Sequence, residues 1–182
     1  MRIVLSFLML FSLISSCEEK VKPPVARNLD AQSLPTQESW NTTVVFSDSG
    51  RLRAKLKAGH FSMYEQRRET LLDSNIRIDF FNADGAHSSL LTAKRGRVDD
   101  ATQNMEAFEN VVVVSDSGTV VKTEYLFWDN KTRKVRSDKF VSVTSPKEHL
   151  EGYGFEADQG IQNYTIYRVS GSAAVKQQKD SL

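Results

Sequence analysis

The sequence has one cysteine, three histidines and almost no net charge, and each of these shortages excludes a class of protein. With 24 basic and 23 acidic side chains the formal net charge is +1, so no electrostatic feature indicates nucleic acid as a partner. His60, His87 and His149 share no metal-site spacing, and no HExxH, GxSxG, P-loop or GxGxxG pattern occurs. We therefore expect a protein that is not an enzyme, with no cofactor and no metal site.

The first residues have the pattern of an export signal followed by an acylation site. Arg2 precedes an apolar run over residues 3–14, which is shorter than the roughly 20 residues that a membrane-spanning helix needs. Small residues then lead to Cys17, in a pattern that resembles a bacterial lipobox. We expect a signal peptide over residues 1–16 and a lipid-modified Cys17, carrying acyl groups such as palmitate. The alternative is an ordinary signal peptide beside an incidental cysteine.

Composition beyond the cysteine predicts one folded domain between two irregular segments. Residues 17–35 are polar and contain prolines, as expected of a linker that begins at the lipidated cysteine. Residues 36–171 carry the regular patterns and are numerous enough for one domain with its own core. Residues 172–182 are mostly polar, and we expect a flexible tail there.

Period-two alternation, rather than helical periodicity, dominates the domain. Over residues 51–58 basic and apolar residues alternate strictly, which places the charges on one face of a strand and the apolar groups on the other. Runs rich in valine, isoleucine, threonine and aromatic residues predict further strands over 43–46, 76–81, 111–114, 119–128, 140–143 and 164–169. The sequence therefore predicts an all-β fold.

Short polar segments ending in glycine separate pairs of these strands. They cover 47–50, 82–85 and 115–118, and a weaker copy without glycine covers 145–148. Asp and Asn form local turn hydrogen bonds and glycine adopts positive φ, so each segment predicts a hairpin turn rather than a calcium loop. Because the three glycines recur every 33 to 35 residues, we expect a rolled antiparallel sheet of stacked hairpin units.

The alternation also assigns side chains to the two faces of the sheet. The apolar face could be an ordinary β core or the lining of a ligand groove, and its candidates are Leu52, Leu56, Ile78, Phe80, Val112, Val114, Tyr125, Phe127, Val141 and Val143. Opposite them on their strand lie the basic residues Arg51, Arg53, Lys55 and Lys57. We interpret this basic row as a solvated surface, and contact with anionic phosphates is the alternative.

Several short motifs, in their order and spacing, resemble the LptC family over about residues 36 to 171. They are Glu38-Ser39-Trp40, Phe46-Ser47-Asp48-Ser49-Gly50, Leu91-Thr92-Ala93, Asn110-Val111-Val112-Val113, Thr123-Glu124-Tyr125-Leu126-Phe127-Trp128-Asp129 and Leu150-Glu151-Gly152-Tyr153-Gly154-Phe155. The resemblance implies a β-jellyroll domain. The chain departs from many family members in one respect, because they carry an uncleaved transmembrane helix where this sequence has a lipobox.

The resemblance implies a lipopolysaccharide-binding protein that takes part in lipopolysaccharide export. It would receive lipopolysaccharide from an inner-membrane ABC transporter complex and pass it to a periplasmic or outer-membrane β-jellyroll acceptor protein, with the apolar face as the lipid groove. Strand-to-strand docking of these partners would use the sheet edges, for which we expect Val44, Phe46 and Ile166. We expect an exported lipoprotein on the periplasmic side, anchored in the inner rather than the outer membrane.

Two other classes of protein fit an exported all-β lipoprotein. A structural or adhesin-type surface lipoprotein would have a filled core with sealed ends. A cell-wall glycan-processing enzyme would need carboxylates clustered in a polar cleft. An apolar interior with accessible ends would favour lipid transport over both.

Overall fold

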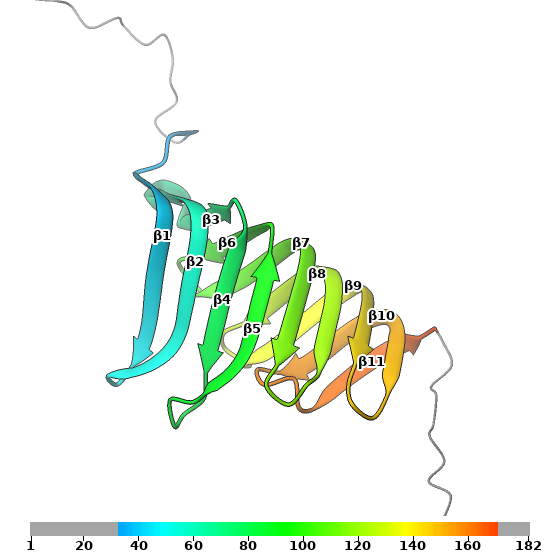
Figure 1. Cartoon of the computed structure of the whole chain (residues 1–182). Helices are drawn as coiled ribbons and strands as arrows, with labels where there is room; N and C mark the ends of the chain where they lie inside the picture. Colours follow the sequence, from blue (N-terminus) through cyan, green and yellow to red (C-terminus); the bar gives the residue numbers. More distant parts are fainter. Residues whose placement is uncertain (1–32, 171–182) are drawn as a thin grey trace, which may run out of the picture. The chain divides into compact units, whose positions relative to one another are not determined.

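Antiparallel strands account for nearly all the regular structure over residues 33–170, the part of the chain that the computed structural model describes. The strands are β1 (Gln37–Asp48), β2 (Arg51–Tyr64), β3 (Glu69–Asp73), β4 (Ile76–Phe81), β5 (His87–Ala93), β6 (Arg95–Asp99), β7 (Asn104–Ser115), β8 (Val120–Asp129), β9 (Lys134–Thr144), β10 (His149–Asp158) and β11 (Tyr164–Val169). A short 3-10 helix, η3 (Glu65–Arg67), follows β2. All eleven strands join one sheet that runs from β1 to β11 (Figure 1). The predicted all-β, jellyroll-like fold is confirmed.

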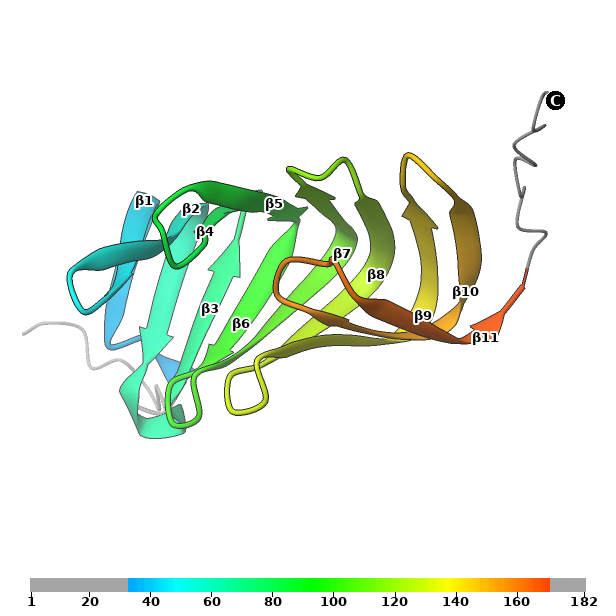
Figure 2. The same ribbon diagram turned by 90° about the horizontal axis from the view of Figure 1, so that it is seen from below.

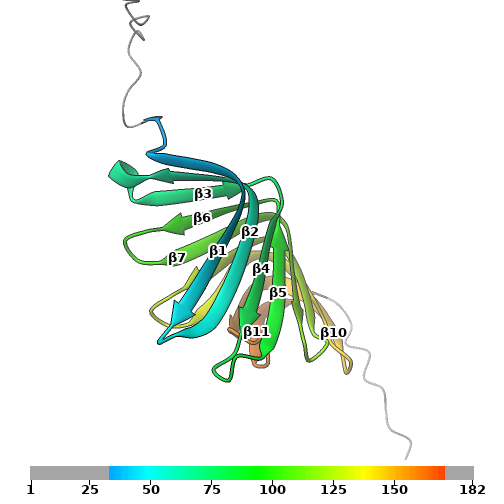
Figure 3. The ribbon, with the colours of Figure 1, turned by 60° about the vertical axis from the view of Figure 1, so that its left-hand side comes forward.

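A crease divides the sheet into two walls, because long strands change partners along their length. Residues 54–57 of β2 pair with β4, whereas residues 60–64 of the same strand pair with β3. Residues 112–115 of β7 likewise pair with β5, and residues 104–108 pair with β6. We name the wall that contains β4 and β5 the first wall, and the one that contains β3, β6 and β11 the second wall. Figure 3 shows the walls diverging from the crease.

Left-handed backbone residues bend several strands at the crease. They are Asn41 in β1, Glu109 and Asn110 in β7, and Gly154 in β10. The pairing of β8 with β9 also shifts register between Thr123 and Phe127. Such bulges insert extra residues on one strand, sharpen its bend and can invert the face that the following side chains occupy.

The first wall ends in the four hairpin turns that the sequence predicted. Gly50, Gly85 and Gly118 lie in the β1–β2, β4–β5 and β7–β8 turns, with φ angles of 77°, 82° and 88°. These angles are strained for residues with a side chain, which explains why glycine recurs at this spacing. The fourth turn joins β9 to β10, where the Ser145 N–H donates to the Glu148 carbonyl at 2.8 Å.

The second wall carries turns built on aspartate, which the sequence analysis did not predict as a repeated feature. The Asp99 and Asp129 side chains each accept hydrogen bonds from the backbone N–H groups two and three residues later. In both turns the N–H of the fourth residue after the aspartate donates to its carbonyl, at 2.7 and 2.8 Å. The shared signal is an aspartate followed by threonine three residues later.

Apolar side chains fill much of the space between the walls. The least exposed are Leu56, Val111, Val121, Val141, Val143, Phe155 and Ile161, at 2% or less. Polar groups that enter this core are satisfied, since Thr123 Oγ1 donates to the Phe140 carbonyl at 2.8 Å. Throughout residues 33–170, every buried side-chain nitrogen or oxygen has a hydrogen-bond partner, as native cores require.

Candidate functional site

The core is incomplete near β1, β2 and β4, where the walls enclose a cavity of about 220 Å³. We name it the main cavity. The first wall contributes Phe46, Ala54, Leu56, Ile78 and Phe80, and the second wall and its strands contribute Val98, Met105 and Trp128. Apolar groups from both walls therefore face each other across an open space.

A smaller space of about 70 Å³ continues this interior towards the middle of the sheet. We name it the inner cavity. Its lining is almost entirely apolar, and Ile78, Phe80, Met105 and Trp128 belong to both cavities. Ile161, from the β10–β11 loop, is inserted between the walls here with 2% of its surface exposed and a φ of 53°. A positive φ is unusual for a β-branched residue, so the surrounding packing must hold this loop in place.

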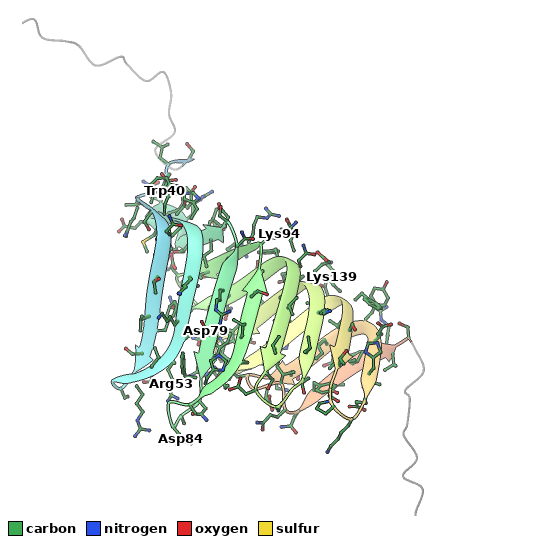
Figure 4. The ribbon with its side chains drawn as sticks, in the orientation of Figure 1. Trp40, Arg53, Asp79, Asp84, Lys94 and Lys139 are labelled. Atoms are coloured by element: carbon green, nitrogen blue, oxygen red, sulfur yellow. The ribbon has the colours of Figure 1, made fainter. Side chains whose placement is uncertain are left out.

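The interior opens to solvent through a polar mouth of about 600 Å³ between the turns of the two walls. Arg53, Arg133 and Gln159 line both the mouth and the main cavity. Figure 4 labels Arg53 near the start of β2, at the same end of the sheet as Asp84 in the β4–β5 turn. Figure 2, a view from below, shows the β10–β11 loop reaching back towards the other strands.

Five of the predicted lining residues lie on the interior face. Leu56, Ile78 and Phe80 line the main cavity. Val141 and Val143 are fully buried in the part of the core that side chains fill. Leu56, Ile78 and Phe80 therefore lie in a hollow section of the apolar face. Val141 and Val143 lie in a filled section of the same face.

The predicted facing of Val112 and Val114 is wrong. Val111 and Val113 are buried at 1% and 4% exposure, whereas Val114 is 39% exposed and Val112 is intermediate. In a run of four valines both faces of the strand are apolar, so composition does not reveal which alternate pair points inward. The prediction was one residue out of phase and therefore assigned the alternate valine pairs to the wrong faces.

Tyr125 and Phe127 also lie on the outer face, because β8 bends between Thr123 and Phe127. Thr123 and Leu126 are both buried, so the inward alternation restarts one residue later. The Tyr125 ring packs against Phe108 with centroids 5.4 Å apart. Partial burial, and then the charge of nearby Glu106, raises the pKa of the Tyr125 hydroxyl.

A second bulge corrects the predicted faces of β2. Phe46 pairs with Ala54 and Ser47 with Leu52, so Arg53 is the extra residue on its strand. The bulge puts Leu52 out of phase with Leu56, and it turns Arg53 from the predicted outer row to the cavity lining. Bulges of this kind commonly re-aim a side chain beside a functional site.

The predicted edge strands are the two ends of the described sheet. β1 pairs only with β2, and β11 only with β10, among the described strands. The side chains of Val44 and Ile166 pack against the core, and Phe46 lines the main cavity. The free edges therefore present backbone groups, while these three side chains face inward.

Sequence reasoning missed Met105, Trp128 and Ile161 as lining residues. Trp128 and Met105 are opposite each other in the β7–β8 ladder, in the half of each strand beyond the crease. The signal for Trp128 was the apolar run 125–128, read with the wrong phase, whereas Met105 lies between polar residues. Ile161 lies in a loop, where alternation carries no information.

The predictions for residues 1–16, Cys17, most of the linker and the tail 172–182 lie outside the described residues. Within residues 33–170, no helix is long and apolar enough to span a membrane. The same residues contain no cluster of histidine, cysteine, aspartate or glutamate that could hold a metal ion.

One comparison with known proteins gives a match over almost the entire chain. The family model LptC, described as lipopolysaccharide-assembly, LptC-related, matches residues 1–172. The search of curated proteins gave no match. The matched range includes every strand described above.

Proposed function

The chain belongs to the LptC family of lipopolysaccharide-assembly proteins, and from that premise we propose that the space between its walls shelters lipopolysaccharide acyl chains during export. The family takes part in lipopolysaccharide transport and is a transport component rather than an enzyme family. The observation that carries the proposal is the main cavity, which is lined by apolar side chains from both walls and open at a polar mouth.

The binding energy would come from apolar burial, which needs no specific polar contact with the chain. Each buried methylene contributes about 0.8 kcal/mol. Because this contribution is non-directional, an acyl chain can slide along an apolar surface without breaking hydrogen bonds. Such a surface supports holding and release, as a transport component requires.

The volume of the main cavity, about 220 Å³, sets a condition on this function. An apolar cavity of about 150 Å³ holds a molecule as small as benzene, so the described state has room for part of one acyl chain. We infer that the walls part to admit a larger lipid. Their backbone ladders run along each wall, so parting would disturb side-chain packing more than it disturbs backbone hydrogen bonds.

Ile161 sets a second condition, because its buried side chain lines the inner cavity between the walls. A lipid that moves from the main cavity towards β11 would displace this side chain. The Ser115 hydroxyl donates to the Gly160 carbonyl at 3.3 Å, a long and weak hydrogen bond from the first wall to the loop. We infer that the β10–β11 loop moves during transfer.

The free edges of β1 and β11 fit the partners that we propose. An unpaired strand edge accepts a strand from another chain through backbone hydrogen bonds. We propose that β1 docks the inner-membrane ABC transporter complex and that β11 docks a periplasmic or outer-membrane β-jellyroll acceptor. A signal peptide and acylated Cys17 would hold the chain at the periplasmic face of the inner membrane, and mass spectrometry of the N-terminal peptide tests that part.

Photocrosslinking in cells tests the proposed interior directly. A photoreactive amino acid replaces Phe80, which lines both cavities, or Tyr125, which lies on the outer face. We expect lipopolysaccharide adducts from position 80 that depend on a working transporter, and few from position 125. Both variants carry the same probe, so the comparison controls for expression and light dose.

Two outcomes would contradict the proposal. Absence of adducts at position 80, in a protein that is folded and exported, would reject the interior as the lipid site. Equal adducts at both positions would indicate that lipid contacts the surface without entering. Either result would favour a structural or adhesin-type role.

A further inference from the structure

Arg53 and Arg133, from opposite walls, both line the mouth of the main cavity, and we propose that they bind the phosphate headgroup of a lipid whose acyl chains enter the apolar interior. Arg53 belongs to β2 and Arg133 to the β8–β9 turn. Both line the mouth as well as the main cavity. This site rests on the proposed function, since the tails must occupy the apolar interior for the headgroup to lie at the mouth.

Arg53 reaches the mouth because of the β2 bulge. Without the extra residue, the alternation of residues 51–58 would place Arg53 on the outer face with Lys55 and Lys57. Its nearest carboxylate is Asp48, 3.6 Å away, and both side chains are substantially exposed. An exposed pair at that distance contributes little, so a phosphate could replace Asp48 with a small loss.

Arg133 is available for a ligand because its neighbours are committed to other groups. The Asp129 carboxylate accepts hydrogen bonds from backbone N–H groups of its own turn, and it also accepts one from Arg136 Nη1 at 3.1 Å. These turn hydrogen bonds hold the pKa of Asp129 below its ordinary value, and the one from the Thr132 N–H has the largest effect. Within residues 33–170 Arg133 forms no ion pair, and its guanidinium carbon lies 5.9 Å from the Trp128 ring centroid, above the apolar lining.

The other carboxylates at the mouth are also occupied. Asp116 lies 2.8 Å from His87 Nδ1. Asp158 accepts the backbone N–H groups of Gln162 and Asn163, which shape the β10–β11 loop. Arg133 Nη1 donates a long hydrogen bond to Asn130 Oδ1 at 3.4 Å, and Arg53 has the 3.6 Å contact with Asp48. The mouth therefore presents two guanidinium groups with weak partners, beside carboxylates that already have closer ones.

Guanidinium chemistry selects the ligand. Its planar fork of N–H donors matches the oxygens of a phosphate group, and charge-assisted hydrogen bonds of this kind are stronger than neutral ones. Two such groups directly above an apolar cavity match an amphiphile with a phosphorylated head and acyl tails. Lipid A, the phosphorylated membrane anchor of lipopolysaccharide, has this chemistry.

Crosslinking from position 80 to purified lipids tests the site. The full-length protein, in nanodiscs of zwitterionic phospholipid, receives either phosphorylated lipid A or lipid A whose phosphates have been removed enzymatically. We expect Arg53→Gln and Arg133→Gln to lower the adduct yield with phosphorylated lipid A by about threefold to tenfold, and to leave the yield with the dephosphorylated lipid unchanged. Arg133→Lys should give an intermediate yield, because lysine keeps the charge and lacks the planar fork, and added salt should reduce the preference.

Arg51→Gln is the matched control, because Arg51 is exposed and donates to the Ala83 carbonyl at 3.2 Å. Equal yields for the two lipids in the native protein would overturn the headgroup site while leaving the lipid-binding interior intact. No adduct with either lipid would instead reject the proposed function. If inorganic phosphate abolished the preference at millimolar concentration, the arginines would be a site for free phosphate, and the lipid-headgroup assignment would be wrong.

Discussion

Near β1, β2 and β4 the walls enclose a cavity of about 220 Å³, whereas near β9 and β10 side chains fill the equivalent space. Val141, Val143 and Phe155 are at most 1% exposed in the filled half. Phe80 and Trp128, which border the hollow half, are only partly buried. One sheet thus contains a section with room for a ligand and a section packed like an ordinary core.

The difference indicates a division of roles along the sheet. Close packing gives the filled half most of the stabilising contacts, because dispersion contacts are lost wherever a void remains. The hollow half lacks some of that stabilisation and gains accessible apolar surface. A transport component needs both, since an interior that is hollow throughout would collapse or unfold.

Replacing a phenylalanine in each half gives the largest expected contrast. Phe155→Ala should lower the free energy of unfolding by about 3–5 kcal/mol, because it removes a fully buried ring that packs against Tyr164. Phe80→Ala should cost about 1–2 kcal/mol, since that ring is partly exposed and already borders a cavity. Urea titration of both variants checks the order. Equal losses would show that the two halves are packed alike.

Substitution of a glycine in β10, the strand that pairs with β11, gives the next largest expected loss of stability. A Cβ on Gly152 would lie 2.3 Å from the Arg168 carbonyl oxygen and 2.6 Å from Ile166 Cγ2, whereas one on Gly160 would meet nothing closer than 3.6 Å. We expect Gly152→Ala to cost about 1–3 kcal/mol by pushing β11 away from β10, and Gly160→Ala to be close to neutral. Hydrogen exchange should show lost protection confined to β10 and β11. Unchanged protection there would contradict this account of β11.

The repeat of glycine turns made the fold predictable from the sequence. Gly50, Gly85 and Gly118 mark the turns of the first wall, and their spacing equals one hairpin unit. The aspartate turns of the second wall were missed, because their signal depends on hydrogen bonds from an aspartate side chain to N–H groups two and three residues later. Glycine turns are visible from one residue type, and aspartate turns are not.

The interior was only partly predictable because alternation fixes a period and leaves the phase open. It placed Leu56 and Ile78 correctly, and it failed at Val112 and Tyr125. Bulges at the crease reset the phase within a strand, and nothing in the alternation of β8 marks where that occurs. The same limit concealed Arg53, whose inward position depends on the β2 bulge.

Two side chains make the ends of the sheet differ in their response to pH. His60 in β2 lies 3.0 Å from Asp73 in β3 and 2.7 Å from Glu38 in β1. Both contacts raise the pKa of His60 above 6.5, and the one with Asp73 has the larger effect. At the other end, burial and then hydrogen bonding to Glu148 raise the pKa of Tyr164 to about 12. A raised folded-state pKa stabilises the fold below the unfolded-state pKa, and the contribution is lost as pH rises through the folded value.

The smallest expected effect is therefore a difference in the pH at which β1 and β11 lose protection from hydrogen exchange. His60 starts to lose its contribution just above pH 6.5, whereas Tyr164 retains its own until the pH passes 10. Between about pH 6 and pH 8.5, exchange corrected for its intrinsic rate should accelerate in β1 and stay constant in β11. His60→Gln should remove the pH dependence of β1, and Tyr164→Phe should not affect it. If β11 lost protection first, the histidine would not be what holds β1 to the sheet.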